Sequence, residues 1–170
     1  MAYSIDELNQ MSGEEFVAAF GDVAEHSPWV AEDAARTRPF VDREDVIGKF
    51  TAALQGASLN DQLSVLRAHP DLAGKAAIAG ELTEDSRNEQ AGAGLDKLTG
   101  EEFGRFTTLN DAYKARFDIP FIFAVKGADK ASILKSFGER VGNDVETELA
   151  NALDNVCRIL RFRIEDRVAR

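Results

Sequence analysis

The sequence has very little cysteine and histidine, and this scarcity excludes several kinds of site. Cys157 is the one cysteine among 170 residues, so an internal disulfide is impossible and a reducing compartment is favoured. Two histidines and one cysteine, without ligand-like spacing, do not build a zinc site, so we expect no metal. The four prolines are scattered, and no internal repeat is visible.

Long apolar runs and nucleotide-binding motifs are also missing. No stretch approaches the roughly 20 apolar residues of a membrane span, and the first residues alternate polar and apolar, unlike a secretory signal. There is no phosphate-binding glycine loop, dinucleotide fingerprint or nucleophile elbow. The formal net charge of −10 disfavours nucleic acid and anionic membranes as partners, because both require a basic surface.

The composition is that of an ordinary globular protein, with 44% hydrophobic and 29% charged residues. At this length we expect a single domain, residues 1–170, with a sizeable core. Helix-start signals dominate, so we predict an all-α bundle of about eight or nine helices. Capping boxes predict helices that start at Ser4, at Ser12 and at Thr99, the last of which runs to Phe117. Three further helices are predicted from Pro28 to about Arg38, from Asp42 to Leu54 and from Ser58 to Ala68. Shorter helices are predicted to start at Asp71 and Thr83, and the last helix covers residues 144–168.

One segment does not fit the helical pattern. Residues 120–127 form a short apolar run bounded by Pro120 and Gly127, and we expect an extended stretch near 121–125. Too little else resembles a strand to build a sheet, so its main-chain groups need other partners. A bound ligand would supply them, or the segment is a core-filling connector, which is the plainer interpretation.

His69 is the strongest acid/base candidate by residue type. Pro70 follows at once and disfavours helical geometry at His69, so a helix is predicted to end at Ala68. The end of a helix favours a protonated imidazole. The alternative role is a histidine that caps the last carbonyls. The other histidine, His26, is interpreted as a loop residue.

A second polar cluster follows about seventeen residues later. Ser86, Glu89 and Gln90 share one helical face and present a hydroxyl, a carboxylate and an amide. Small residues follow at 91–94 and permit close approach, although glycines there weaken a helix. A solvated surface helix is the alternative.

Arg163 is the most informative residue of the last predicted helix. Helical spacing places it within the apolar stripe formed by Val145, Leu149, Ala152, Val156, Ile159 and Leu160. Arg158 and Arg161 fall on the opposite face. A charge on a core-facing stripe requires a partner, which is either a structural acid, the commoner case, or a bound anion. An arginine at the end of the stripe can also reach out to solvent.

These residues together indicate a cofactor-free enzyme that applies acid/base chemistry to a small polar molecule. Several motifs then add a family resemblance: the chain resembles 2-oxo-4-hydroxy-4-carboxy-5-ureidoimidazoline (OHCU) decarboxylases. The matching pieces are Glu25 to Ala31, Arg38 to Phe40, His69 to Leu72, Ser86 to Gln90, Leu109 and Asn110 with Tyr113, Arg116 with Phe117, and Pro120 to Val125. They occur in family order over nearly the whole chain. Asp118 and Ile119 replace the small or apolar residues usual before the proline.

The resemblance implies an all-helical, homodimeric enzyme without a cofactor, which converts OHCU to (S)-allantoin in urate breakdown. It implies that His69 is the catalytic acid/base and that Glu89 assists it. It further implies a substrate pocket lined by Pro70, Ser86, Arg87, Asn88, Gln90, the main chain of Phe121, Ile122, Phe123, Ala124 and Val125, and Arg163. The chain ends at Arg170 without a peroxisomal signal, so a cytoplasmic enzyme is expected. The alternative is a helical module that binds a small ureide or purine without turnover.

Overall fold

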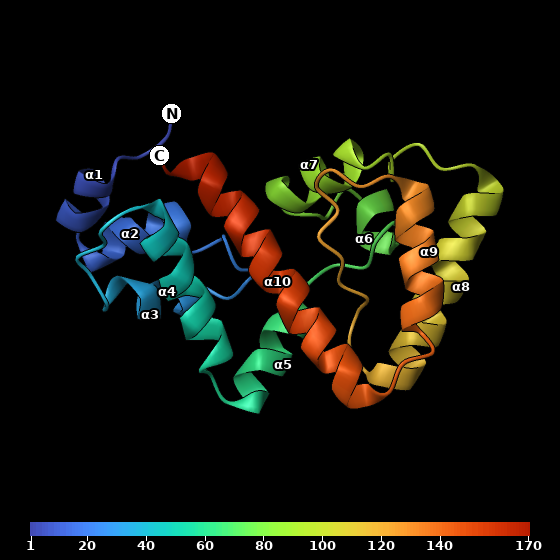
Figure 1. Ribbon diagram of the computed structural model, residues 1–170. Coiled ribbons are helices and arrows are strands. Elements are labelled where there is room, and N and C mark those ends of the chain that lie inside the picture. Colours follow the sequence, from blue (N-terminus) through green and yellow to red (C-terminus); the bar gives the residue numbers. More distant parts are fainter. The chain divides into compact units, whose positions relative to one another are not determined.

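The computed structural model describes the main chain of residues 1–170 and every side chain except those of Lys75 and Ala76. The regular structure of this described chain is α-helical, and one isolated bridge pairs Tyr3 with Val168. The predicted all-α class is confirmed. In chain order the helices are α1 (Ile5–Gln10), α2 (Gly13–Phe20), α3 (Trp29–Ala35), α4 (Arg43–Gln55), α5 (Leu59–Ala68), α6 (Lys75–Ile78), α7 (Glu84–Gly92), α8 (Gly100–Phe117), α9 (Lys130–Arg140) and α10 (Val145–Arg167) (Figure 1).

Local capping interactions explain where several helices begin. Ser4, Ser12 and Thr99 each accept a hydrogen bond from the amide three residues later, and the glutamate at that position bonds back to the cap. These are the three capping boxes predicted from the sequence. Asp42 and Thr83 cap α4 and α7 through their side-chain oxygens.

α3 is shorter than predicted. It follows Pro28, which serves as its N-cap, and it ends at Ala35 instead of near Arg38. Side chains explain the early end. The Thr37 hydroxyl donates to the carbonyl of Ala34, and Nε of Arg38 donates to that of Ala35. Carbonyls at the helix end are therefore satisfied without a further turn.

Two more helices differ from the sequence prediction. The short helix expected from Asp71 is α6, which begins four residues later. α9 was not predicted. Its capping box has Asp129 as the cap and Ser132 at the third helical position, the reverse of the hydroxyl-then-carboxylate pattern used to find the others.

The chain forms two compact units. Unit 1 contains residues 1–68 and 156–170, and unit 2 contains residues 69–155. α10 supplies its first half to unit 2 and its second half to unit 1. The single domain expected from the chain length stays a prediction.

Unit 1 is built around aromatic side chains. α3 packs against both α2 and α4. The rings of Phe16 and Phe20 stack with their centroids 4.9 Å apart, and Phe16 lies 6.1 Å from Phe50. All three side chains are fully buried. Burial of phenylalanine in such a cluster is a major source of stability in a unit of this size.

Unit 2 has its own aromatic core. α8 and α9 lie side by side (Figure 1). The ring of Phe121 stacks on Phe137 of α9 at 3.8 Å and meets Tyr113 of α8 edge-on at 5.4 Å. The apolar segment 121–125, which has no helical structure, is therefore part of this core.

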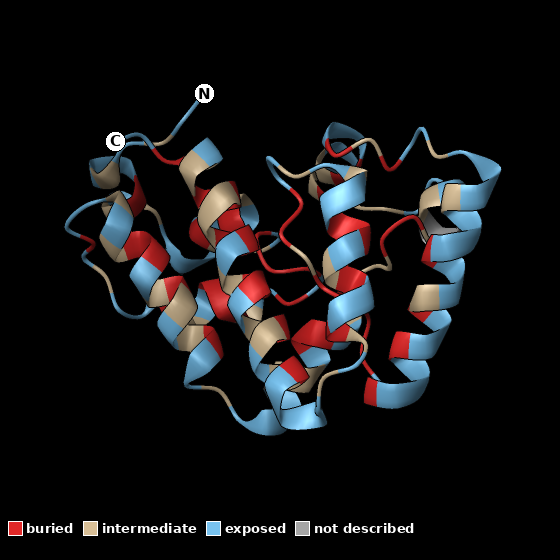
Figure 2. Cartoon of the chain, turned by 45° about the vertical axis from the view of Figure 1, so that its right-hand side comes forward, coloured by how far each residue is buried: buried red, intermediate tan, exposed pale blue. Residues whose placement is uncertain are grey.

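Most helices bury one side and expose the other, as the alternation of red and pale blue in Figure 2 shows. The buried stripe of α10 begins at Glu148 and not at Val145, which is 60% exposed. It continues through Ala152 and Val156 to Ile164. Two polar residues, Glu148 and Asn155, thus lie on a face that was expected to be apolar in this part of α10.

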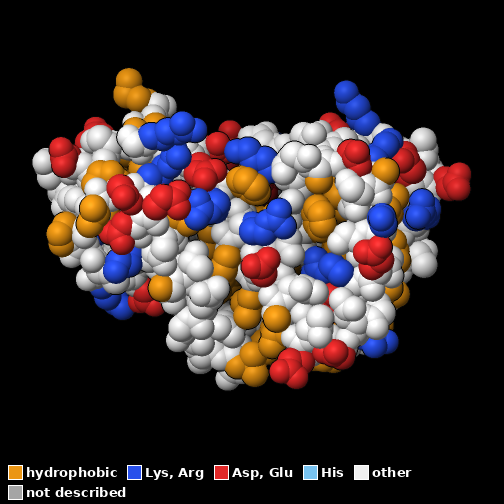
Figure 3. Space-filling view, viewed as in Figure 1, with side chains coloured by type: hydrophobic (Ala, Val, Ile, Leu, Met, Phe, Trp, Pro, Cys, Tyr) orange, Lys and Arg blue, Asp and Glu red, His pale blue; other side chains and the backbone are white. Residues whose placement is uncertain are grey.

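Basic and acidic side chains are interspersed on the face drawn in Figure 3. No single basic patch dominates that face, although Lys and Arg together number 20. Among the described helices, none combines the length and the apolar character required to cross a membrane.

Candidate active site

His69 lies directly after the end of α5, as predicted. The helix stops at Ala68 because Pro70 disfavours helical geometry at the residue before it. The side chain of His69 is not a surface group, since the residue is only 8% exposed. Its Nε2 atom is buried without a hydrogen bond, and the residue makes another interaction within the protein.

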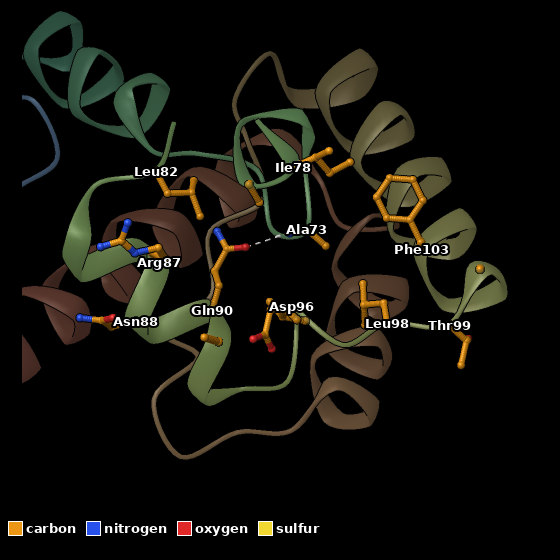
Figure 4. A pocket seen from close by; sticks show the side chains of 14 residues that line it. Ala73, Ile78, Leu82, Arg87, Asn88, Gln90, Asp96, Leu98, Thr99 and Phe103 are labelled. Atoms are coloured by element: carbon orange, nitrogen blue, oxygen red, sulfur yellow. Dashed lines mark hydrogen bonds between the residues drawn. The ribbon is translucent and has the colours of Figure 1, made fainter. Parts of the chain in front are cut away.

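The loop that follows His69 and Pro70 is held by Gln90 of α7. The Gln90 Oε1 accepts a hydrogen bond from the amide of Ala73 at 3.0 Å, and Nε2 donates to the carbonyl of Asp71 at 3.3 Å. Figure 4 shows the first of these bonds as a dashed line. Gln90 is 5% exposed, the bond to Ala73 is buried, and the bond to Asp71 is partly buried. The structure therefore joins the two polar clusters of the sequence through Gln90.

Two side chains of α8 hold the same loop. Nδ2 of Asn110 donates to the carbonyl of Leu72 at 2.9 Å in a buried position. Nζ of Lys114 lies 2.6 Å from Oδ2 of Asp71 at the surface. The loop needs this support because Ala73 has a φ of 53°, a left-handed conformation that costs a residue with a Cβ about 1–2 kcal/mol.

The predicted polar face of α7 is formed, but its members differ in exposure. Ser86 and Gln90 are buried, and Glu89 is half-buried. Arg87 and Asn88 are exposed. In Figure 4 both point away from the middle of the adjacent cavity, at one edge of it. Ser86 and Gln90 thus form the buried part of α7, Glu89 is partly exposed beside them, and Arg87 and Asn88 are exposed.

Unit 2 contains a cavity of about 810 Å³ next to α7. Three predicted site residues contribute to it, and most other walls are apolar. Its described lining residues are Ala73, Ala77, Ile78, Leu82, Arg87, Asn88, Gln90, Ala91, Leu95, Asp96, Leu98, Thr99, Gly100 and Phe103. His69, Ser86 and Glu89 are not among these described lining residues.

The apolar segment 121–125 obtains main-chain partners from side chains. Nη1 of Arg140 donates to the carbonyl of Ile122 at 2.8 Å, and the amide of Ala124 donates to Oδ1 of Asn155 at 3.0 Å. Phe121, Ile122, Ala124 and Val125 are buried, and Phe123 is half-buried. The core-filling interpretation is therefore correct for part of the segment. The single amide hydrogen of Ala124 is engaged by Asn155, which leaves it no further bond to offer a substrate.

Arg140 belongs to a buried polar network that the sequence analysis did not find. Its guanidinium donates through Nε and Nη2 to the carboxylate of Glu148, at 3.1 Å and 2.9 Å. The same carboxylate accepts the hydroxyl of Tyr113 at 2.7 Å. Glu148 and Tyr113 are fully buried, and Arg140 is 8% exposed. The network is satisfied from several sides, as a buried charge requires.

The network shifts the ionisation of its members. Burial raises the pKa of the Tyr113 hydroxyl, and the hydrogen bond to Glu148 raises it further. Burial alone would raise the pKa of Glu148 as well, but hydrogen bonds from Arg140, Tyr113 and Asn143 outweigh it and leave that pKa below the ordinary value. Tyr113 is therefore neutral and Glu148 is charged across the physiological pH range.

Arg163 of unit 1 has the structural acid partner that was one of its predicted alternatives. Its Nη2 donates to Oε1 of Glu25 at 3.0 Å, and Nη1 donates to the carbonyl of Val23 at 3.1 Å. Arg163 is 3% exposed and Glu25 is 1% exposed. Arg161 is turned toward solvent and pairs with Glu44, as its position on the opposite face predicted. A direct contact between Arg163 and a substrate stays a prediction.

Glu148 is the member of the missed network that lies on α10, and its sequence signal is weak. Glu148, Asn155 and Arg163 recur at spacings of seven and eight residues, which is close to two helical turns. At about 100° per residue, however, Glu148 and Asn155 lie about 60° and 80° away from Arg163 around the helix, so the stripe argument that selected Arg163 does not select the other two. Asn110 and Arg140 each also donate to a main-chain carbonyl of a loop, at Leu72 and Ile122, and no local sequence pattern indicates those two bonds. Among the described side chains, no group of three histidines, cysteines or carboxylates is placed to hold a metal ion.

Comparison with known proteins agrees with the resemblance of the motifs. The family model for OHCU decarboxylase matches residues 9–165. A Haloferax volcanii relative named 2-oxo-4-hydroxy-4-carboxy-5-ureidoimidazoline decarboxylase is 38% identical, over 96% of this chain and 95% of its own. A human relative, named as a putative decarboxylase of the same kind, is 37% identical over 95% and 94% of the two chains.

A solved structure points the same way. The crystal structure of an (S)-allantoin synthase has a TM-score of 0.77 and 27% identity, and the match covers 98% of this chain and 54% of that one. The family match spans most of the sequence, and the relatives align along nearly their whole length. The chain belongs to the OHCU decarboxylase family.

Proposed function

We propose that this protein catalyses the decarboxylation of OHCU to (S)-allantoin in urate degradation. Membership of the OHCU decarboxylase family over residues 9–165 is the observation that carries the proposal. The residues that the family resemblance assigns to catalysis, His69 and Glu89, are both present: His69 follows the end of α5, and Glu89 lies on α7.

His69 is the proposed acid/base. Loss of the carboxylate as carbon dioxide breaks one carbon–carbon bond, and its electron pair passes into the conjugated ring of the substrate. The product is completed by a proton delivered to one face of that ring. A buried imidazole with little freedom supplies this proton from one direction, which accounts for a single enantiomer.

Glu89 and the remaining predicted residues assist. The carboxylate of Glu89 orients or polarises His69, and Ser86 with Pro70 shapes the pocket. Main-chain amides of 121–125 stabilise charge that develops on the ring oxygen, as in other sites where fixed dipoles face a growing negative charge. The Ala124 amide is the exception, because it is bonded to Asn155.

Gln90 has a role besides substrate contact. Its carboxamide fixes the loop after His69 through two hydrogen bonds, so it also acts on the position of the catalytic histidine. Arg87 and Asn88 are exposed and line the cavity next to α7. For Arg163 the proposed substrate contact comes in addition to its ion pair with Glu25.

The conjugated ring accepts the electrons of the broken bond, so the proposed reaction needs no organic cofactor and no metal. Activity is expected to persist after exhaustive dialysis against a chelator, and restoration by one divalent ion would contradict this. We further propose that the protein is a cytoplasmic homodimer. Sedimentation of the purified protein will test the oligomeric state.

The decisive experiment supplies OHCU from urate in situ with purified urate oxidase and hydroxyisourate hydrolase. Circular dichroism then follows the allantoin enantiomer, and carbon dioxide release is measured in parallel. The proposal expects one carbon dioxide per OHCU and excess (S)-allantoin above the enzyme-free control. Tight binding of OHCU or allantoin without acceleration would instead identify a binding module.

A further inference from the structure

The segment 121–125 is held from inside unit 2 at two points. The carbonyl of Ile122 is bonded to Arg140 of α9, and the amide of Ala124 is bonded to Asn155 of α10. The two holding residues come from different helices, and both are 8% exposed. A non-helical segment fixed at residues 122 and 124 has little freedom to rotate the peptide groups between and beside them.

We infer that Arg140 and Asn155 are positioning residues for the reaction, which set the direction in which the remaining main-chain amides of 121–125 face the substrate. The inference rests on the proposed function, in which these amides stabilise developing charge. Arg140 and Asn155 contact the segment and not the substrate.

The geometry of Arg140 supports a positioning role. Three nitrogens of its guanidinium are bonded, Nε and Nη2 to Glu148 and Nη1 to Ile122. Its planar group also lies over the ring of Phe121, 4.5 Å from the centroid. A guanidinium fixed by a carboxylate and an aromatic face donates to the Ile122 carbonyl in one orientation only. Arg140 therefore makes more directed interactions than a side chain that only fills space in the core.

The geometry of Asn155 likewise supports a positioning role, in this case for the amide of Ala124. Its Nδ2 donates to the carbonyl of Asn151 one turn earlier at 2.9 Å, which fixes the plane of the side-chain amide. Oδ1 is then directed to the amide of Ala124. The side-chain amide of Asn155 therefore transmits the rigidity of α10 to the segment.

A buried ion pair is weak evidence for stability, because well-packed apolar side chains often stabilise a core as much or more. The charged side chain of Arg140 has a geometric role here, because an apolar residue at position 140 would fill the space but could not direct the Ile122 carbonyl. A purely structural role and a positioning role therefore predict different outcomes for variants that keep the fold.

The test compares two asparagines on the same helix. Asn155→Ala removes the acceptor for the Ala124 amide. Asn151→Ala is the matched control, because it keeps the main-chain carbonyl that Asn155 uses and removes one side-chain bond to Glu148. The Glu148 carboxylate keeps its bonds from Arg140, Tyr113 and Asn143, so Arg140 stays held. For each variant the kcat, the KM, the enantiomeric excess of allantoin, the melting temperature and the amide hydrogen exchange of 121–125 are measured.

We expect Asn155→Ala to lower kcat about five- to tenfold, the value of one hydrogen bond, with a lower enantiomeric excess and a smaller change in KM. Amide exchange at Ala124 and Val125 should become faster. Asn151→Ala should keep kcat and the exchange of this segment close to wild type. Equal kcat and equal enantiomeric excess in the two variants at similar melting temperatures would overturn the inference.

Asn155→Asp covers the case in which the alanine variant does not fold. The aspartate keeps an oxygen that can accept the hydrogen bond of the Ala124 amide, so its kcat should be closer to wild type than that of a variant without an acceptor. A kcat as low as that of a variant without an acceptor would contradict the positioning role of Asn155. Activity of the wild type on OHCU decides the proposed function separately. Unchanged amide exchange in 121–125 of folded Asn155→Ala protein, which lacks the acceptor, overturns the positioning role whatever that activity is.

Discussion

Nη2 of Arg163 donates to Oε1 of Glu25 across 3.0 Å, and the two buried side chains are 138 residues apart in the sequence. This ion pair ties the second half of α10 to the loop before α3 within unit 1. A charge in such a position is stabilising only while its partner is present, because the remaining charge would be buried alone.

Arg163→Gln is therefore expected to destabilise the protein by about 3–5 kcal/mol, the usual cost of removing one partner of a buried pair. Chemical denaturation and thermal melting measure this. Arg161→Gln is the control, since Arg161 and Glu44 are largely exposed and their pair should contribute little. A melting temperature of Arg163→Gln equal to that of the control would show that the pair is not structural. An increase in KM for OHCU in folded Arg163→Gln would support the proposed substrate contact as well.

Tyr113 is expected to make the stability of the protein depend on alkaline pH. Its pKa in the folded protein is raised from the ordinary value of 10.0 by burial and by the bond to Glu148. The unfolded chain therefore loses the phenolic proton first. The stabilisation from Tyr113 is complete below about pH 10 and declines as the pH rises toward the folded pKa.

Denaturation experiments between pH 8 and 11 test this. Tyr113→Phe should show a smaller decline in unfolding free energy above about pH 10. The protein has one other tyrosine, Tyr3, which is half-buried, so Tyr3→Phe is a suitable control. If both variants decline with the same slope as the wild type, Tyr113 is not responsible for the dependence.

Asn110 is expected to affect catalysis through the loop after His69. Asn110→Ala leaves the buried carbonyl of Leu72 without its donor, which costs about 1–3 kcal/mol. Because that loop adjoins His69, kcat should fall more than KM rises. Lys114→Ala is the control on the same helix, since it removes an exposed contact to Asp71. Equal kinetic effects of the two variants would exclude a specific role for Asn110.

Local signals explain which parts of the structure could be predicted. The capping boxes at Ser4, Ser12 and Thr99 involve residues three apart, so the sequence contains both partners. The end of α5 at Ala68 follows from one residue pair, His69 and Pro70. In each case the physical cause lies within one helical turn.

Long-range partners explain what could not be predicted. The helical stripe located Arg163, but nothing near it indicates Glu25 as its acid. The same holds for Gln90. The sequence predicted the polar helical face to which Gln90 belongs, but its bonds to Asp71 and Ala73 depend on how the loop folds. α9 was missed for a different reason, because Asp129 and Ser132 exchange the residue types of the usual pattern.

The last prediction concerns His69 itself. His69→Asn preserves the approximate size and a polar group but removes the titrating nitrogen, so the fold should survive while stereoselective formation of allantoin falls by about 10²–10⁴-fold. The one other histidine provides the control: His26 is 70% exposed in its side chain, and His26→Asn should leave kcat unchanged. Glu89→Gln should lower kcat with little change in melting temperature, because the shape of the side chain is kept while the charge that orients His69 is removed.

These three variants are measured together by circular dichroism of the product and by thermal melting. A folded His69→Asn protein with near wild-type carbon dioxide release and near wild-type enantiomeric excess would refute the catalytic assignment. If Glu89→Gln and Ser86→Ala both unfold, α7 has a structural role and the proposed site is wrong there. Loss of enantiomeric excess at preserved carbon dioxide release in His69→Asn would place the histidine at the protonation step, because decarboxylation would then continue without it while the proton arrives from either face.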